Sequence, residues 1–428
     1  MWNTAAVAFG RNTSRTFLGM GQGNGKRAAG GARRAILLGA TLMLIAFNLR
    51  TAVTSLGPVL LDAMASLHLS AAEASVLTTI PSLCFGLLGP VAPILGRRLG
   101  PQRALLAVLL LLVLGVSLRA VPSAVALFAG QTLAAVGIGV INVLLPGLVK
   151  REFPRRIPEM TGLYTMSFCF GAAIAAGATV PLQHGVAGSW SLALGLWALP
   201  VGVATALWLR WVPWRGEAAG ERPPAVRGLW RDKLAWQVTF FMGLQSALAY
   251  IVFGWLAPIL RSRGLAAVDA GFALSLSVIA QAGASLIAPK LATLGRDQRL
   301  ANALGVVFTL VGILGCVYGP LSTVWLWSVV LGMSQGSLIA IALMLIALRA
   351  ADSHIATQLS GMVQGVGYII SAGGPLLAGL LHSWTGGWDA VAALTVVIGA
   401  GLLASGVAAG RGGHVKAGRP TRGLQDRR

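Results

Sequence analysis

Arg50 is the residue in this sequence best placed to do chemistry, because it interrupts an apolar stretch near its middle. The stretch LLGATLMLIAFNLRTAVTSLGPVLL covers positions 37–61. An arginine at the centre of a bilayer costs about 2.5–3.5 kcal/mol on insertion scales. Arg50 also lies about 15 residues beyond the basic pair Arg33-Arg34, or roughly 22 Å along a helix. Its side chain therefore cannot easily reach that interface.

A cation at this depth needs a partner, and the sequence offers no carboxylate nearby. All twelve acidic residues fall in loops, tails or the ends of apolar stretches. We therefore expect Arg50 to face a watery cavity, where a guanidinium is a good donor for small carboxylate-like or linear anions. The alternative is a structural role, in which Arg50 donates to carbonyls of a neighbouring helix.

Two sets of residues flank Arg50 on a helix of 100° per residue. The set on its own face is Phe47, Thr54 and Gly57, and the set on the neighbouring side is Asn48, Thr51 and Ser55. Among these polar residues, Asn48 and Thr54 are candidates for contact with a bound solute. Pro58 lacks an N–H and frees the carbonyl of Thr54, which predicts a gate or, alternatively, a passive bend.

The composition indicates that helices in a membrane must position these residues. The 428 residues are 56% hydrophobic and only 11% charged, whereas soluble domains carry about 25% charge. Stretches of roughly 20 apolar residues span a bilayer as helices, and we count twelve of them. We place these spans at 35–62, 73–96, 103–120, 124–149, 159–183, 190–211, 234–261, 268–293, 299–318, 322–348, 358–383 and 388–410.

The basic residues orient these spans rather than bind nucleic acid. The net charge is +21, but 29 of the 33 Lys and Arg residues fall in the tails and in alternate loops. This is the positive-inside pattern, and it predicts cytoplasmic termini. Four arginines lie outside these groups, and they are Arg50, Arg119, Arg261 and Arg263.

A charged linker divides the chain into two halves of six spans. We expect a disordered basic tail at 1–34, a bundle at 35–211, the linker at 212–233, a second bundle at 234–410 and a basic tail at 411–428. The halves echo each other at offsets near 200 residues, so that Pro58 corresponds to Pro258 in the seventh span. A six-helix repeat predicts an all-α transporter of two pseudo-symmetric bundles, with Pro258 as a second hinge.

Other polar residues fall on inner faces of the spans by periodicity. We select six as candidates for contact with a solute: Asn142, Tyr164, Gln245, Gln335, Gln364 and Tyr368. The alternative for each is a hydrogen bond that only joins two helices.

Three motifs resemble the cyanate/nitroimidazole transporter (CynX/NimT) family of the major facilitator superfamily. They are FNLRTAVTSLGPVL at 47–60, LTTIPSLCFGLLGPVAPILGRRLG at 77–100 and GIGVINVLLPGLVKREFP at 137–154. The resemblance implies that the two bundles alternate access to a central site for a small, often anionic or polar, solute. It also implies that spans one, four, seven and ten line the cavity, which favours Asn142, Gln245 and Gln335.

The loop between spans two and three departs from the superfamily pattern. Arg97 stands where the pattern has an aspartate, so the charge pairing of that aspartate does not carry over. Arg98, Gly100 and Arg103 keep the rest of the pattern. We expect these three residues to take part in gating or, alternatively, to anchor the loop at the cytoplasmic surface.

The leading function is secondary transport of a small anion or polar solute across a bacterial inner membrane. The alternatives are an exporter of drugs or toxicants such as nitroimidazoles, and a membrane sensor that binds without transport.

We expect a monomer, no enzyme activity, no cofactor and no metal. The G-x-S-x-G sequence at 332–336 lies inside an apolar span, which is the wrong context for a hydrolase. We also expect that no central Asp or Glu carries a proton.

Overall fold

The computed structural model describes residues 17–89, 91–212 and 228–416, and these residues form helices without strands. Twelve helical spans within them are long and apolar enough to cross a membrane. The sequence prediction of a twelve-span all-α protein is confirmed. The linker residues 213–227 and the tail residues 1–16 and 417–428 lie outside the described part of the chain.

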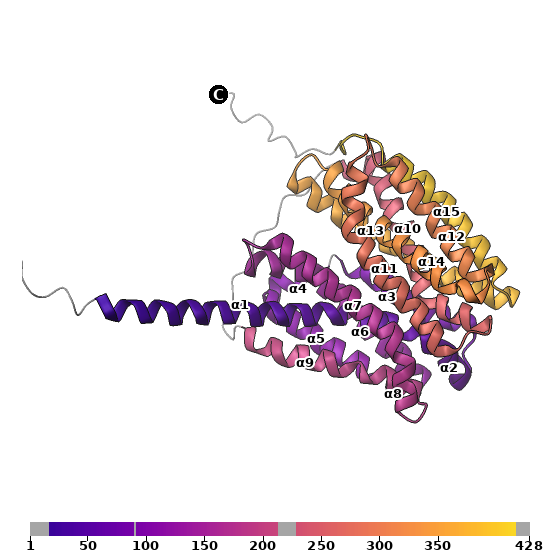
Figure 1. Ribbon diagram of the computed structural model, residues 1–428, viewed down its shortest axis with the longest axis horizontal. Helices are drawn as coiled ribbons and strands as arrows, with labels where there is room; N and C mark the ends of the chain where they lie inside the picture. Colours follow the sequence, from indigo (N-terminus) through magenta and orange to yellow (C-terminus); the bar gives the residue numbers. More distant parts are fainter. Residues whose placement is uncertain (1–16, 90, 213–227, 417–428) are drawn as a thin grey trace, which may run out of the picture.

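The N-terminal half supplies the first six spans (Figure 1). Its helices are α1 (Phe17–Thr54), α2 (Leu56–Leu67), α3 (Ala71–Leu88), α4 (Val91–Leu99), α5 (Pro101–Leu118), α6 (Ala124–Glu152), α7 (Ile157–Gly185), α8 (Trp190–Leu196) and α9 (Ala198–Trp208). Two of the six spans contain two α-helices each, namely α1 with α2 in the first span and α8 with α9 in the sixth. The second span ends with α3 at Leu88, earlier than the predicted boundary at position 96, and α4 lies beyond it.

The C-terminal half forms the second bundle, which lies beside the first in Figure 1. Its helices are α10 (Lys233–Ser262), α11 (Ala267–Thr293), α12 (Arg299–Tyr318), α13 (Val324–Arg349), α14 (Ser353–Thr385) and α15 (Asp389–Ala409). Each of these spans contains a single unbroken α-helix. The two repeats therefore differ in their helix breaks although they share their order of spans.

The helix α1 begins earlier than the sequence predicts. It starts at Phe17, within the segment that we expect to be a disordered tail. That segment is rich in glycine, which has low helix propensity, so its composition gave no indication of a helix. The membrane-spanning part of α1 starts at Arg33, close to the predicted boundary at position 35.

Two pairs of helices form most of the contact between the halves. Helix α3 packs against α14, and α7 packs against α11. We call the end of the molecule that contains Trp211, Lys233 and Arg349 the linker end, and the opposite end, which contains Asp62 and Arg261, the far end. At the far end α2 also contacts α10 and α11, whereas α4 at the linker end packs mainly on helices of its own half. The far end is therefore closed by contacts across the halves.

Helix α10 is the most enclosed span. In its most apolar 18-residue window 89% of the residues are buried, against 33% for α11 and for α15. It contacts α14, α15, α11 and α13 of its own half, and α2 and α3 of the other. Side chains on α10 therefore face both bundles.

Candidate functional site

The guanidinium of Arg50 lies among three aromatic rings contributed by both halves. Its central carbon is 4.6 Å from the ring centre of Phe168 on α7, 5.0 Å from Phe253 and 5.7 Å from Tyr250, both on α10. We call these three rings the aromatic cage. A ring face attracts a cation, by about 2 kcal/mol or more where water is excluded. The cage therefore holds Arg50 in place without neutralising its charge.

Arg50 differs from the other three arginines that lie outside the basic clusters. Arg119 donates to the carbonyl of Ala52 and to the hydroxyl of Ser55. Arg261 pairs with Asp62, and Arg263 donates to carbonyls at the end of α12. Within the described residues, the Arg50 guanidinium has ring contacts only. Its hydrogen-bond donors are thus available to a solute.

Two further rings extend the cage. Phe85 on α3 and Tyr368 on α14 have ring centres 5.7 Å apart, and each also meets Tyr250 edge to face, at 6.4 Å and 6.5 Å. Because α3 and α14 belong to different halves, this cluster also crosses the boundary between the bundles. Tyr368 is the one ring here that the sequence selected as a candidate.

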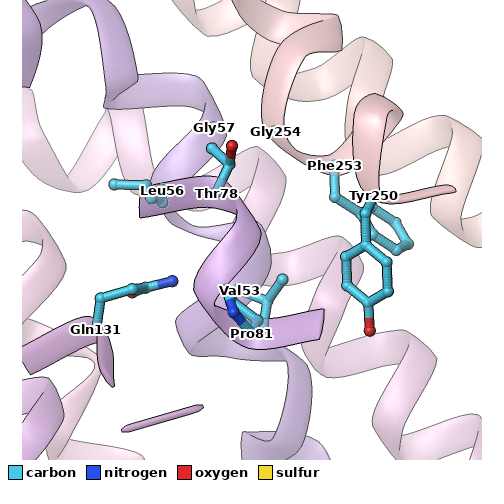
Figure 2. Close-up of a pocket in the computed structure, with 9 residues that line it drawn as sticks. All are labelled: Val53, Leu56, Gly57, Thr78, Pro81, Gln131, Tyr250, Phe253 and Gly254. Atoms are coloured by element: carbon cyan, nitrogen blue, oxygen red, sulfur yellow. The ribbon is translucent and has the colours of Figure 1, made fainter. Parts of the chain in front are cut away.

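A small cavity lies beside the cage, between the halves (Figure 2). Its volume is about 10 Å³, which leaves room for about one water molecule. Figure 2 shows Tyr250 and Phe253 on one side of this pocket and Gln131 on the other. The hydroxyl of Tyr250 and the amide oxygen of Gln131 are buried and have no hydrogen-bond partner within the described residues. Two sides of this pocket therefore carry polar atoms without partners among the described residues.

Two predicted contact residues on α1 turn toward neighbouring helices instead. The amide of Asn48 donates to the carbonyl of Leu44 at 2.7 Å and to that of Pro200 on α9 at 3.3 Å. The hydroxyl of Thr54 donates to the carbonyls of Arg50 at 2.9 Å and Ala172 on α7 at 3.0 Å. Both side chains are fully buried, so their geometry matches the structural alternative.

The remaining predicted residues lie on several helices. Gln245 donates to Met242 and Ser246 on its own helix α10, and Gln364 donates to Ser360 on α14. Gln335 on α13 is buried, and its amide nitrogen has no partner within the described residues. Asn142 on α6 and Tyr164 on α7 are half-buried. Tyr164 lies one turn before Phe168, which contacts Arg50.

The first span breaks close to the predicted hinge. Helix α1 ends at Thr54 and α2 begins at Leu56, two residues before Pro58. The last carbonyls of a helix lack partners within it, and the buried Arg119 fills one such need by donating to Ala52 at 2.9 Å. In contrast, α10 runs without interruption through Pro258.

An ion pair that the sequence analysis missed joins the halves at the far end. Arg261 on α10 forms two bonds to the carboxylate of Asp62 on α2, at 2.8 Å and 3.2 Å, and a third to the carbonyl of Pro58 at 3.2 Å. The two side chains are 20% and 28% exposed. The repeat contained a signal for this pair, because opposite charges occupy almost equivalent positions of its two halves.

The residues that keep the superfamily pattern between spans two and three lie at the linker end. Gly100 has a φ of +79° between α4 and α5, a backbone conformation that favours glycine. Arg98 is exposed, and Arg103 is half-buried at the start of α5. The backbone conformation of this turn thus explains why position 100 is a glycine.

Comparisons with known proteins identify the family. The Major Facilitator Superfamily profile matches residues 42–375. The Uncharacterized transporter YycB of Bacillus subtilis (strain 168) is 40% identical over 87% of this chain and 93% of its own length. Two proteins of Escherichia coli (strain K12) also match. The 2-nitroimidazole transporter is 35% identical over 90% of this chain and 98% of its own, and the Cyanate transport protein CynX is 30% identical over 81% and 90%.

A solved structure agrees in fold. A mutant of the nucleoside transporter NupG aligns with a TM-score of 0.70 over 86% of this chain and 99% of that chain, at 14% identity. From the profile, the relatives and the twelve helical spans, the chain belongs to the cyanate/nitroimidazole transporter (CynX/NimT) family of the major facilitator superfamily.

Proposed function

We propose that this transporter moves a small anion, or a small polar solute, and that Arg50 binds it. The observation that carries the proposal is the state of Arg50. Its guanidinium lies between the two bundles, where rings from both halves approach it, and it has no ionic or hydrogen-bonding partner within the described residues. Arg50 is half-buried, and a cation without a counter-ion in such a site favours an anion over a cation.

We also propose an orientation of the protein in the membrane, from which it follows toward which side the site is closed. The positive-inside pattern supports an orientation in which the termini, and hence the linker end, lie in the cytoplasm of a bacterial cell, with the protein in the inner membrane. The far end, which Asp62 and Arg261 close, then faces outward. In this state the site near Arg50 is sealed from outside, and alternating access requires that the pair separate. We propose a monomer, without catalytic activity, as the working unit.

The movement of the two bundles is proposed to depend on five residues, namely Pro58, Pro258, Arg98, Gly100 and Arg103. Pro58 is the strongest of them, because it follows a helix break and its carbonyl accepts from Arg261 across the halves. Among the predicted contact residues, Tyr368, Tyr164, Gln335 and Asn142 remain proposals for the wall of the path. Gln245 and Gln364 are proposed to join them once their intrahelical bonds are exchanged for bonds to solute.

A thermal-shift screen of small anions on purified protein tests this function. We expect a stabilising anion, such as cyanate or a short carboxylate, whose effect disappears in Arg50→Ala. Arg411→Ala is the matched control, because Arg411 is exposed beyond α15 and its loss leaves the response intact. If Arg50→Ala keeps the response of the wild-type protein, Arg50 is structural and the proposal fails.

A second candidate is the export of neutral ring compounds such as nitroimidazoles. The observation in its favour is the 35% identity to a protein that bears the name 2-nitroimidazole transporter, together with the ring-rich site. Transport of 2-nitroimidazole into inverted vesicles by both wild-type and Arg50→Ala protein would favour this function over the first.

A further inference from the structure

The aromatic cage restricts which anions fit beside Arg50. We propose that the solute is a flat, conjugated acid with a single ring, in the class of benzoate, bound by its carboxylate to Arg50 and by its ring between the rings of the cage. This inference rests on the proposed function, and it adds the chemical class of the solute. Four observations support it, and they concern the charged donors, the aromatic walls, the hydroxyl of Tyr250 and the size of the cavity.

The first observation is the number of charged donors. Within the described residues, Arg50 is the one cation whose side chain contacts the cage. Tetrahedral oxyanions such as sulfate need donors around several oxygens, and burying those oxygens unbonded is costly. A carboxylate needs two parallel bonds, which one guanidinium fork supplies. The donor set therefore favours a carboxylate over a tetrahedral anion.

The second observation is the nature of the walls. Phe168 and Phe253 present their faces to the guanidinium from different halves, at 4.6 Å and 5.0 Å. A carboxylate conjugated to a ring is coplanar with it, so a ring bound to the fork of Arg50 extends the same layer. Aromatic rings gain from offset or edge-to-face contact beyond the area that they bury. The cage is therefore expected to bind an acid with a flat aromatic ring more tightly than an acid of equal charge with a saturated ring.

The third observation is the unused hydroxyl of Tyr250. This group is buried and lacks a partner within the described residues, although its ring lies 5.7 Å from the Arg50 guanidinium carbon. A carboxylate has about four acceptor positions, and Arg50 takes two of them. Tyr250 can donate to a third. A buried hydroxyl without a partner is unfavourable, and a bound carboxylate relieves that.

The fourth observation concerns size. The cavity beside the cage holds only about 10 Å³ in this state, and Tyr250, which lines it, is in ring contact with both Phe85 and Tyr368. Separation of the halves by the thickness of one ring opens a slot between Phe168 of one half and Phe253 of the other. A solute of one ring fits such a slot, whereas a fused or branched one needs a larger movement.

Competition binding with two matched acids tests the class. Benzoate and cyclohexanecarboxylate share charge and size, but only benzoate is flat and aromatic. We expect calorimetry on the wild-type protein to give at least about fivefold tighter binding of benzoate, the factor for one ring contact, and no binding of sulfate. Equal affinities for the two acids, or preference for sulfate, overturn the inference.

Variants separate this inference from the proposed function. Phe168→Leu is expected to remove the preference for benzoate while it keeps carboxylate binding, and Phe253→Leu repeats the test from the other half. Phe170→Leu is the control, because Phe170 is 61% exposed on the same helix. Tyr250→Phe is expected to weaken both acids and keep their ratio.

The results distinguish two failures. If Arg50→Gln abolishes both acids but Phe168→Leu and Phe253→Leu leave the ratio unchanged in folded protein, the ring class is wrong and the anion site stands. If Arg50→Gln binds both acids as the wild type does, the proposed function itself is wrong. Melting temperatures of each variant without ligand identify any that fail to fold, and the wild-type ratio then decides alone.

Discussion

Asn48 and Arg50 lie two residues apart on α1, and their side chains contact different parts of the molecule. Arg50 points to the cage at the boundary of the halves, whereas Asn48 donates to Pro200 within its own half. Two residues separated by 200° on a helix face different neighbours. The polar character of both is visible in the sequence, but which neighbour each one meets depends on long-range packing.

Asn48→Ala removes a hydrogen bond between α1 and α9, and bonds of this kind contribute about 0.6–2 kcal/mol in membrane proteins. We expect a lower melting temperature with unchanged anion affinity, measured by thermal shift and by calorimetry. A loss of anion affinity without a loss of stability would place Asn48 in the site instead.

At the scale of elements, the far end is held by α2 and α10. The pair of Asp62 and Arg261 is partly buried and makes two direct bonds, so it contributes more than a fully exposed pair. Asp62→Asn leaves Arg261 without its counter-charge and is expected to shift the balance toward the state that is open at the far end by about 1–2 kcal/mol. A single cysteine near Arg261 in a cysteine-free background should then react faster with a membrane-impermeant maleimide.

The charge-exchanged double variant provides the control for this second prediction. Asp62→Arg with Arg261→Asp restores the attraction in the opposite sense, and labelling should return toward the wild-type rate. Unchanged labelling in Asp62→Asn would show that the close packing of α2 on α10, rather than the ion pair, holds the far end closed.

Gly57 on α2 provides the third prediction. A Cβ atom at this position would lie 2.5 Å from the carbonyl oxygen of Phe253 on α10, so a side chain there keeps the two helices apart. We expect Gly57→Ala to reduce transport in vesicles several-fold while the protein still folds. Gly147→Ala is the matched helical control, because a Cβ there meets no atom within 4 Å, and a similar loss in both variants would refute the close-contact argument.

At the scale of the whole molecule, the distribution of acidic residues leads to the fourth prediction. The pair of Asp62 and Arg261 lies at the far end rather than beside Arg50, so it belongs to closure. Transport should therefore proceed without a proton carried on a central carboxylate. Proteoliposomes with a trapped pH dye test this, with Asp62→Asn and the charge-exchanged variant compared. Solute-driven proton flux lost in both variants, with solute binding intact, would contradict the prediction.

The sequence predicted the number of spans and most of their boundaries, because bilayer thickness imposes these features directly. It predicted a bend near Pro58, close to the observed break at Ser55, but not the partners of Arg119, Asp62 and Phe253. Those depend on contacts between residues far apart in the chain, such as Arg261 and Asp62. Phe253 stood out least, since one more phenylalanine in an apolar helix carries no distinctive pattern.

The enclosure of α10 has a consequence for how this protein tolerates mutation. A helix with 89% of its most apolar 18-residue window buried has almost no face on which a polar or larger residue is free of neighbours. Helices α11 and α15, at 33%, present broad lipid-facing surfaces that accept many apolar residues. In a saturation-mutagenesis library selected for transport of the solute, the accepted substitutions should therefore be fewest along α10. They should be most frequent on the outer faces of α11 and α15.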